Sequence, residues 1–334
     1  MTDLIMAVTL GGGPVVLLLV GLLSLDSYKL VRLPAVARTI LLGAVVALLC
    51  LAIHSVLRKA LGMAGTDYAH WVSPLLEEAL KAVIVLWMVQ RHRVAFLVDA
   101  AIHGFAVGTG FAVIENLVFW HEHAAPSPGV WIARGAGTAL MHGGATALVA
   151  LAAVSTPPRR RNLAALGMAL LPAVLLHGLY NRFLLSPVLS ALLIVLLLPL
   201  LLILAFRRGE RAFGEWLNLG FDADTEMLEL ILSGQVSGSP VGTYLEALRS
   251  RFEGPVVADL LNWLRIHLEL SLAAKGLLLM REAGFTPEPD PETVAKLAEL
   301  EWLENSIGPT GMLAMAPFLR HSSRETWQRS LLRR

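Results

Sequence analysis

The sequence predicts an all-α, polytopic membrane protein, a bundle of about seven transmembrane helices followed by a small cytoplasmic helical domain. Composition, long apolar runs and an uneven distribution of charge support this fold class. Hydrophobic residues make up 56% and charged residues 16% of the 334 residues. Soluble domains typically contain roughly 45–50% apolar and about 25% charged residues. The apolar excess therefore favours a protein that resides in the lipid bilayer.

Seven apolar stretches are long enough to cross a membrane. A hydrocarbon core about 30 Å thick requires about 20 apolar residues in a helix. The stretches are residues 5–25, 36–57, 72–90, 94–119, 131–155, 163–185 and 187–206. Only Ser186 and Pro187 break the sequence between the last two stretches, so we expect a tight helical hairpin there.

Charged residues are concentrated in the last third of the chain. Residues 1–206 contain 13 Lys or Arg and 8 Asp or Glu, whereas residues 207–334 contain 14 and 18. This shift predicts a transmembrane domain over residues 1–206 and a cytoplasmic helical domain over residues 207–334. Neither part is basic enough to suggest a nucleic-acid partner. Cys50, the single cysteine, cannot form an intramolecular disulfide.

The loops between the stretches differ in positive charge, which predicts orientation because cytoplasmic loops retain Lys and Arg. One set of alternating loops carries eleven such residues, and the opposite set carries three, or four with Arg134. The N-terminus is therefore expected outside and the C-terminus in the cytoplasm. The apolar run after Asp3 lacks the features of a signal peptide, so we expect it to be a retained first span.

Several polar residues lie at membrane depth, where each charge opposes insertion by roughly 2.5–3.5 kcal/mol. Spans three to six carry them, and spans one, two and seven have almost none. At about 1.5 Å per residue, one group falls roughly 6–16 Å below the outer surface. The members of this candidate site are Glu77, Glu78, Glu115, His142, His177 and Asn181. Asp99 and His103 lie near the cytoplasmic end and are expected to be structural, while Arg134 is expected at the interface.

The local spacings suggest chemistry. Lys81 follows the paired glutamates by three and four residues, so it shares a helix face with them and can neutralise one. Ionising two adjacent carboxylates in a low-dielectric environment is energetically unfavourable, so one of them should have a raised pKa. A carboxyl group with a raised pKa is suited to act as a general acid or base. His177 and Asn181 are four residues apart on one face and can together hold an oxyanion or a water molecule.

Four motifs in order resemble the PrsW family of intramembrane proteases, a branch of the superfamily that contains the CAAX prenyl endopeptidases. They are LLEEALK at 75–81, FAVIEN at 111–116, RGAGTALMH at 134–142 and HGLYN at 177–181. The resemblance covers about residues 70–185. Lys81 and Glu115 replace an arginine and a histidine of the wider superfamily motifs, which argues against prenylated substrates.

The resemblance implies a peptidase of the bacterial inner membrane that cleaves a membrane-anchored protein, such as an anti-sigma factor, near the outer face. Glu77 or Glu78 would activate water, and His177 with Asn181 would stabilise the tetrahedral intermediate. Glu115 and His142 would orient the water or complete the site. This metal-free mechanism, which needs no cofactor, is favoured.

A zinc-dependent mechanism is the alternative. Glu115, His142 and His177 form a set of two histidines and one glutamate of the type that binds catalytic zinc, with the paired glutamates left as base. A proton- or ion-coupled transporter is another possibility, as is a non-catalytic membrane scaffold. A transporter predicts a polar path across both leaflets, whereas these groups gather on one side.

The tail has apolar residues at helical spacing and no catalytic or nucleotide-binding motif. They include Leu260, Leu261, Leu264 and Leu268, then Val294, Leu297, Leu300 and Leu303. Asp290 and Pro291 are typical of a helix start, and Gly234 to Gly242 resembles a linker. We expect a docking or regulatory domain for a cytoplasmic partner, or amphipathic helices that rest on the membrane surface.

Overall fold

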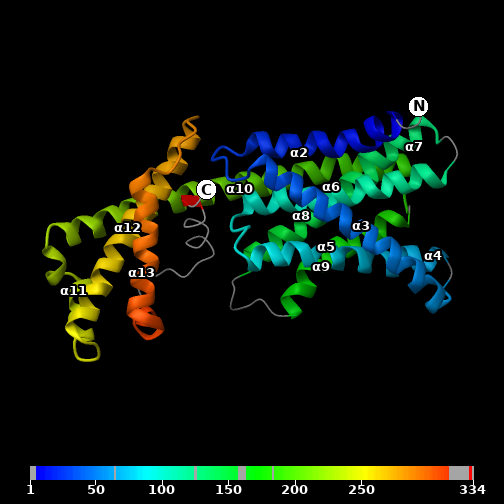
Figure 1. Ribbon diagram of the computed structural model, residues 1–334. Helices are drawn as coiled ribbons and strands as arrows, with labels where there is room; N and C mark the ends of the chain where they lie inside the picture. The colour runs from blue at the N-terminus through cyan, green and yellow to red at the C-terminus, as the bar shows by residue number, and fades with distance from the viewer. Residues whose placement is uncertain are drawn as a thin grey trace. The chain divides into compact units, whose positions relative to one another are not determined.

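The computed structural model describes residues 5–63, 65–123, 126–156, 163–182, 184–315 and 331–332. Within these ranges all regular structure is helical and no strand occurs, which confirms the all-α fold class (Figure 1). The chain forms two compact units. The first lies within Met1–Asp26 and Leu30–Glu210, and the second within Ser27–Lys29 and Arg211–Arg334.

The first unit is a bundle of long helices that run alongside one another (Figure 1). Six described helices are long and apolar enough to cross a membrane. They are Ala7–Leu25, Leu33–Leu61, Leu97–Glu122, Pro128–Ser155, Ala164–Asn181 and Pro187–Leu232. The predicted third span forms helix α5, Ser73–Gln90, which is also apolar except for three buried charged residues. The expected count of about seven therefore agrees with the described bundle.

The elements of this unit follow the predicted spans closely. They are the π-helical turn η1 (Ala7–Gly12), α2 (Gly13–Leu25), α3 (Leu33–Leu61), α4 (Gly65–Asp67), the π-helical turn η2 (Tyr68–Val72), α5, α6 (Leu97–Glu122), α7 (Pro128–Ala133), the π-helical turn η3 (Arg134–Ala139), α8 (Leu140–Ser155), α9 (Leu163–Asn181) and the first part of α10 (Pro187–Leu232). Helix α9 ends at Asn181 and α10 begins at Pro187, so the break between the last two predicted spans lies where it was expected.

Helix α10 is longer than the apolar run that predicted it. The run ends at residue 206, but the helix continues to Leu232 and crosses the boundary between the units at Glu210 and Arg211. Its second half alternates charged and apolar residues, and Phe213 and Leu217 are buried there. The composition changes at this boundary while the helix itself is uninterrupted.

Glycines allow α6 to pack closely against its neighbours. A Cβ atom at Gly108 would overlap the backbone carbonyl of His142 on α8, and one at Gly110 would overlap the carbonyl of Ile40 on α3. Small residues permit such close helix contacts in membranes. This packing brings α6, which carries Glu115, against α8, which carries His142.

The second unit is a small set of helices built on the end of α10. It contains the 3₁₀ turn Gln235–Gly238 (η5), α11 (Pro240–Leu248), α12 (Gly254–Glu282) and α13 (Pro291–Ala314). Asp290 caps α13 by accepting a hydrogen bond from the Thr293 amide, which confirms the predicted helix start. The predicted Gly234–Gly242 linker is in part helical, since α11 begins at Pro240. Val294 is exposed, unlike Leu297, Leu300 and Leu303, which are buried.

Candidate active site

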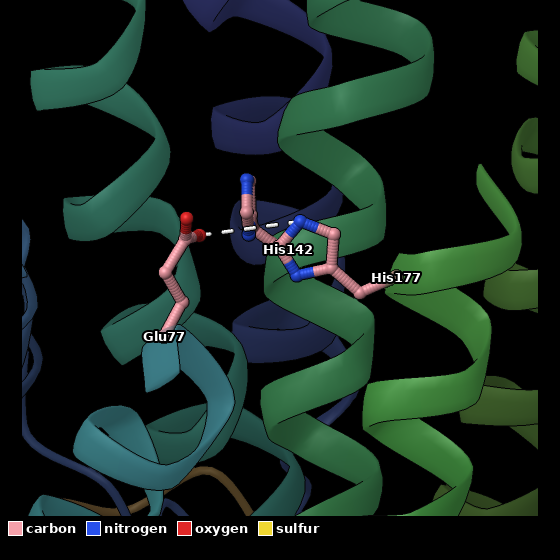
Figure 2. A group of neighbouring side chains, drawn as sticks. All are labelled: Glu77, His142 and His177. Atoms are coloured by element: carbon pink, nitrogen blue, oxygen red, sulfur yellow. Dashed lines mark ion pairs between the residues drawn. The ribbon is translucent and has the colours of Figure 1, made fainter. Parts of the chain in front are cut away.

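Five of the six predicted site residues come together inside the bundle. Glu77 and Glu78 come from α5, Glu115 from α6, His142 from α8 and His177 from α9. Glu78, His142 and His177 are almost completely buried. Figure 2 shows Glu77, His142 and His177 extending toward one another from three different helices. The contacts form because these helices pack side by side, although the residues lie far apart in sequence.

Glu78 is the most buried carboxylate of the cluster, and two donors share one of its oxygens. Lys81 Nζ lies 2.6 Å from Glu78 Oε1, and His177 Nδ1 lies 2.9 Å from the same atom. The lysine therefore neutralises Glu78, as its spacing predicted. Because an ionised carboxylate can only accept, His177 carries its proton on Nδ1 and leaves Nε2 with a free lone pair. Glu78 thus fixes the tautomer and the orientation of His177.

His142 lies between Lys81 and Glu115. Lys81 Nζ is 2.9 Å from His142 Nδ1, and since an ammonium group can only donate, Nδ1 accepts this bond. His142 Nε2 is 2.6 Å from Glu115 Oε2. This is a close contact between an imidazole nitrogen and a carboxylate oxygen, so His142 joins Lys81 on one side to Glu115 on the other.

Glu115 is the most accessible of the three carboxylates. Its side chain is 35% exposed, against 12% for Glu77 and 0% for Glu78. Its other oxygen accepts a 3.1 Å hydrogen bond from Arg134 Nη2, and Arg134 Nε donates to Asn116 Oδ1 at 2.8 Å. Arg134, expected to be a simple interface residue, therefore holds a site carboxylate in place.

Glu77 has partners that sequence reasoning missed. Ser73 Oγ donates to Glu77 Oε1 at 2.5 Å, and His54 Nε2 lies 3.3 Å from the same oxygen. Ser73 is one helical turn before Glu77, so its spacing could have suggested the contact. His54 lies on α3, in a span expected to hold almost no polar residues, and no local pattern connects it with Glu77. The expectation for that span was wrong at His54.

The remaining polar residues lie apart from this cluster. The side-chain amide of Asn181 donates to the backbone carbonyl of Ala69 at 3.1 Å, at the end of α9. Asp99 accepts hydrogen bonds from the amides of Ala95 and Phe96 and caps the start of α6, and His103 bonds to Thr39. These contacts agree with the structural role expected for Asp99 and His103.

The residues also fit a metal ion. One ligand atom each from Glu77, His142 and His177 lie within 4.8 Å of one another, and all three residues are buried. Two imidazoles and one carboxylate are a donor set of catalytic zinc. Glu78 behind His177 forms the carboxylate–histidine pair that typically orients a zinc ligand. The sequence had assigned Glu115 to the metal set, whereas this group contains Glu77 instead.

Comparison with known proteins places this bundle in a family. Residues 32–205, just over half of the chain, match the model of the PrsW family intramembrane metalloproteases, and the match includes all the residues of the cluster. Searches of curated proteins and of solved structures gave no match. The match and the long apolar helices agree in identifying an integral membrane protein. The chain belongs to the PrsW family of intramembrane metalloproteases.

Proposed function

We propose that this membrane protease cleaves peptide bonds of a membrane-anchored protein with the help of a zinc ion held by Glu77, His142 and His177. The observation that carries the proposal is the convergence of these three buried side chains on one point between α5, α8 and α9. Buried acids and imidazoles oppose insertion into a membrane, so their clustering is best explained by function.

When bound, the zinc ion would polarise a water molecule and the scissile carbonyl. Glu78 orients His177 through Nδ1, and Lys81 balances the charge that Glu78 brings into the protein interior. These two residues therefore position a ligand rather than touch the substrate. In the zinc-dependent mechanism, neither of the paired glutamates activates water.

Glu115 is the best candidate for the general base in this mechanism. Its side chain is the most exposed of the three carboxylates in the cluster, at 35%. A base must be within hydrogen-bond reach of the proton that it accepts, and Glu115 adjoins the ligand His142. Arg134 donates a hydrogen bond to the other oxygen and keeps the Glu115 carboxylate oriented.

The position of the cluster suggests the substrate class. Helical rise puts its residues roughly 6–16 Å from the outer surface in the orientation predicted from the loop charges. A substrate anchored in the bilayer would present its cleavage site at that depth, near the outer face of a bacterial inner membrane. By resemblance to the family motifs, an anti-sigma factor is the proposed substrate, and a distant relationship to the CAAX prenyl endopeptidases is part of the same proposal.

A metal-free mechanism is the second candidate, and the surroundings of His142 favour it. Its two nitrogens already lie 2.9 Å from Lys81 and 2.6 Å from Glu115. A nitrogen that binds a metal cannot carry a proton, so metal binding would displace one of these contacts. Without metal, Glu77 is the better base of the pair, because Glu78 is completely buried and neutralised by Lys81.

The test uses the full-length protein in proteoliposomes with quenched-fluorescent single-span peptides of varied sequence. Zinc content is measured by mass spectrometry on the same samples. We expect Glu77→Gln to lose both zinc and cleavage. Glu115→Gln should retain zinc and lose cleavage by about 10²–10⁴-fold, the contribution typical of a general base. Glu122→Gln, an exposed glutamate two turns later on α6, serves as the matched control with normal activity.

Treatment with a chelator separates the two mechanisms. Loss of cleavage that zinc restores supports the metal-dependent mechanism, whereas unchanged cleavage together with an inactive Glu77→Gln supports the metal-free one. Normal cleavage by both Glu77→Gln and Glu115→Gln would contradict a protease active site here and favour a transport or scaffolding role.

A further inference from the structure

The two oxygens of Glu77 have different surroundings. Oε1 is 2.5 Å from Ser73 Oγ and 3.3 Å from His54 Nε2. Oε2 lies 4.0 Å from His177 Nε2, on the side of the histidine pair (Figure 2). One oxygen thus contacts supporting side chains while the other is directed toward the candidate metal ligands. This asymmetry would make Glu77 a ligand through one oxygen.

A tyrosine contacts the other ring nitrogen of His54. Tyr68, which is 4% exposed, has its hydroxyl 2.6 Å from His54 Nδ1. An ionised Glu77 can only accept a hydrogen bond, so the proton of the neutral imidazole lies on Nε2 and Nδ1 is an acceptor. Tyr68 then donates to His54, and His54 donates to Glu77.

We propose that His54 is a positioning residue for zinc binding: it engages Glu77 Oε1, turns Oε2 toward His142 and His177, and is itself held by Tyr68. This inference rests on the zinc-dependent function proposed above. The physical reason is that a carboxylate held by neighbouring donors loses little freedom when it binds a metal. Removing such supporting partners typically weakens metal binding about 10–100-fold.

Helix packing explains why His54 can act in this way. Ser73 lies on the same helix as Glu77 and can only constrain the side chain locally. His54 comes from α3, so its bond ties the Glu77 carboxylate to a second helix of the bundle. Tyr68 belongs to the π-helical turn η2 directly before α5, and π-helical turns are frequent at functional sites.

A purely structural His54 would behave differently. If it only bonded α3 to α5, its replacement would lower the melting temperature while the intact fold bound zinc as before. The zinc dissociation constant therefore distinguishes the two roles, and it can be measured without a substrate.

The experiment titrates the purified, metal-stripped, full-length protein in detergent with Zn²⁺ against a competing chelating dye. We expect His54→Ala to raise the zinc Kd by about 10–100-fold. His54→Gln should restore part of the affinity, since its amide can donate to Oε1, and Tyr68→Phe should have a smaller effect than His54→Ala. His121→Gln, an exposed histidine at the end of α6, is the matched control with wild-type affinity. Thermal melts and size-exclusion profiles verify the fold of each variant.

His177→Ala separates failure of this inference from failure of the zinc proposal. If wild type and His177→Ala bind zinc equally poorly, the metal-dependent function is wrong and this inference is overturned with it. If His177→Ala loses zinc but folded His54→Ala retains wild-type affinity, only the role of His54 is overturned. If His54→Ala does not fold, the other two variants provide the test. Wild-type zinc affinity in both His54→Gln and Tyr68→Phe would then overturn the proposed role of His54.

Discussion

At the scale of single residues, Lys81 is the cation on which the buried cluster depends. It is fully buried and contacts Glu78 Oε1 at 2.6 Å and His142 Nδ1 at 2.9 Å. Lys81→Met leaves Glu78 as an uncompensated buried charge, and breaking such a pair typically costs about 3–5 kcal/mol. We expect a destabilisation of that size in denaturant unfolding of the detergent-solubilised protein.

The double variant tests the reason for this effect. Lys81→Met combined with Glu78→Gln removes both charges, so most of the lost stability should return. Lys59→Met, which removes an exposed lysine on α3, is the control and should be nearly neutral. Equal destabilisation by the single and double variants would show that lost packing, and not the unpaired carboxylate, is the cause.

The sequence predicted most of the cluster, because charged residues are conspicuous in apolar spans. Glu77, Glu78, Glu115, His142 and His177 were all identified in this way. The sequence alone could not show which side chains form hydrogen bonds with these residues. His54 is one histidine in an apolar helix, 23 residues before Glu77, and their contact depends on how α3 and α5 pack. The choice between Glu77 and Glu115 as the carboxylate grouped with the histidines likewise depends on helix rotation.

At the scale of helices, the close packing of α6 and α8 makes Gly108 sensitive to substitution. A Cβ atom there would overlap the His142 carbonyl, so Gly108→Ala must push the helices apart. Overpacking of this kind typically costs about 1–3 kcal/mol. We expect that loss of stability in the same unfolding assay, with weaker zinc binding because α8 carries His142.

Gly21→Ala on α2 is the matched control for this prediction. A Cβ atom at Gly21 has no neighbour within 4 Å, so the substitution should be neutral or slightly stabilising by helix propensity. If Gly108→Ala proves as harmless as Gly21→Ala, close contact of α6 and α8 does not determine the geometry of the site.

The start of α13 offers a prediction about pH. The Thr293 amide donates to Asp290 and lowers the pKa of that carboxyl below its ordinary value of 3.8. A lowered pKa in the folded state means that Asp290 stabilises α13 above about pH 4 and loses this contribution as the pH falls through the folded-state pKa. Hydrogen exchange of the first turn of α13, corrected for intrinsic rates, should therefore accelerate at low pH.

Two variants isolate the role of Asp290. Asp290→Ala removes the cap and should accelerate exchange at all pH values, whereas Asp290→Asn can cap without titrating. The low-pH loss of protection should thus be smaller in Asp290→Asn than in wild type. The same loss in both proteins would mean that another group controls the end of this helix.

Helix positions were more predictable than helix ends. Apolar runs gave the start of each membrane helix, and every end except that of α10, to within a few residues, and Asp290 with Pro291 gave the start of α13. The continuation of α10 to Leu232 was missed because a change of composition was taken as a break, although helix propensity does not require an apolar sequence. The π-helical turns η2 and η3 have no strong sequence signal, yet each directly precedes a helix of the site.

At the scale of the whole molecule, the two parts of the chain are suited to different solvents, lipid for the first and water for the second. The first unit exposes many large apolar side chains, such as Leu17, Leu41 and Leu196, while it buries charged groups. A soluble protein avoids that distribution, and a helix bundle surrounded by lipid requires it. The polar residues of the candidate site are therefore surrounded by helices whose outer surface is apolar. This arrangement implies that a substrate approaches the site from the bilayer or from one membrane surface.

The predicted orientation can be tested by cysteine labelling, because Cys50 is only 1% exposed and should be unreactive in wild type. Lys59→Cys and Arg91→Cys introduce thiols at exposed positions, in the last turn of α3 and directly after α5, which the predicted orientation puts on opposite sides of the membrane. If the N-terminus is outside, a membrane-impermeant maleimide should label Lys59→Cys in intact cells and Arg91→Cys only after permeabilisation. The reverse pattern would invert the topology and put the site near the cytoplasmic face, so a substrate cleaved at the outer surface would no longer fit.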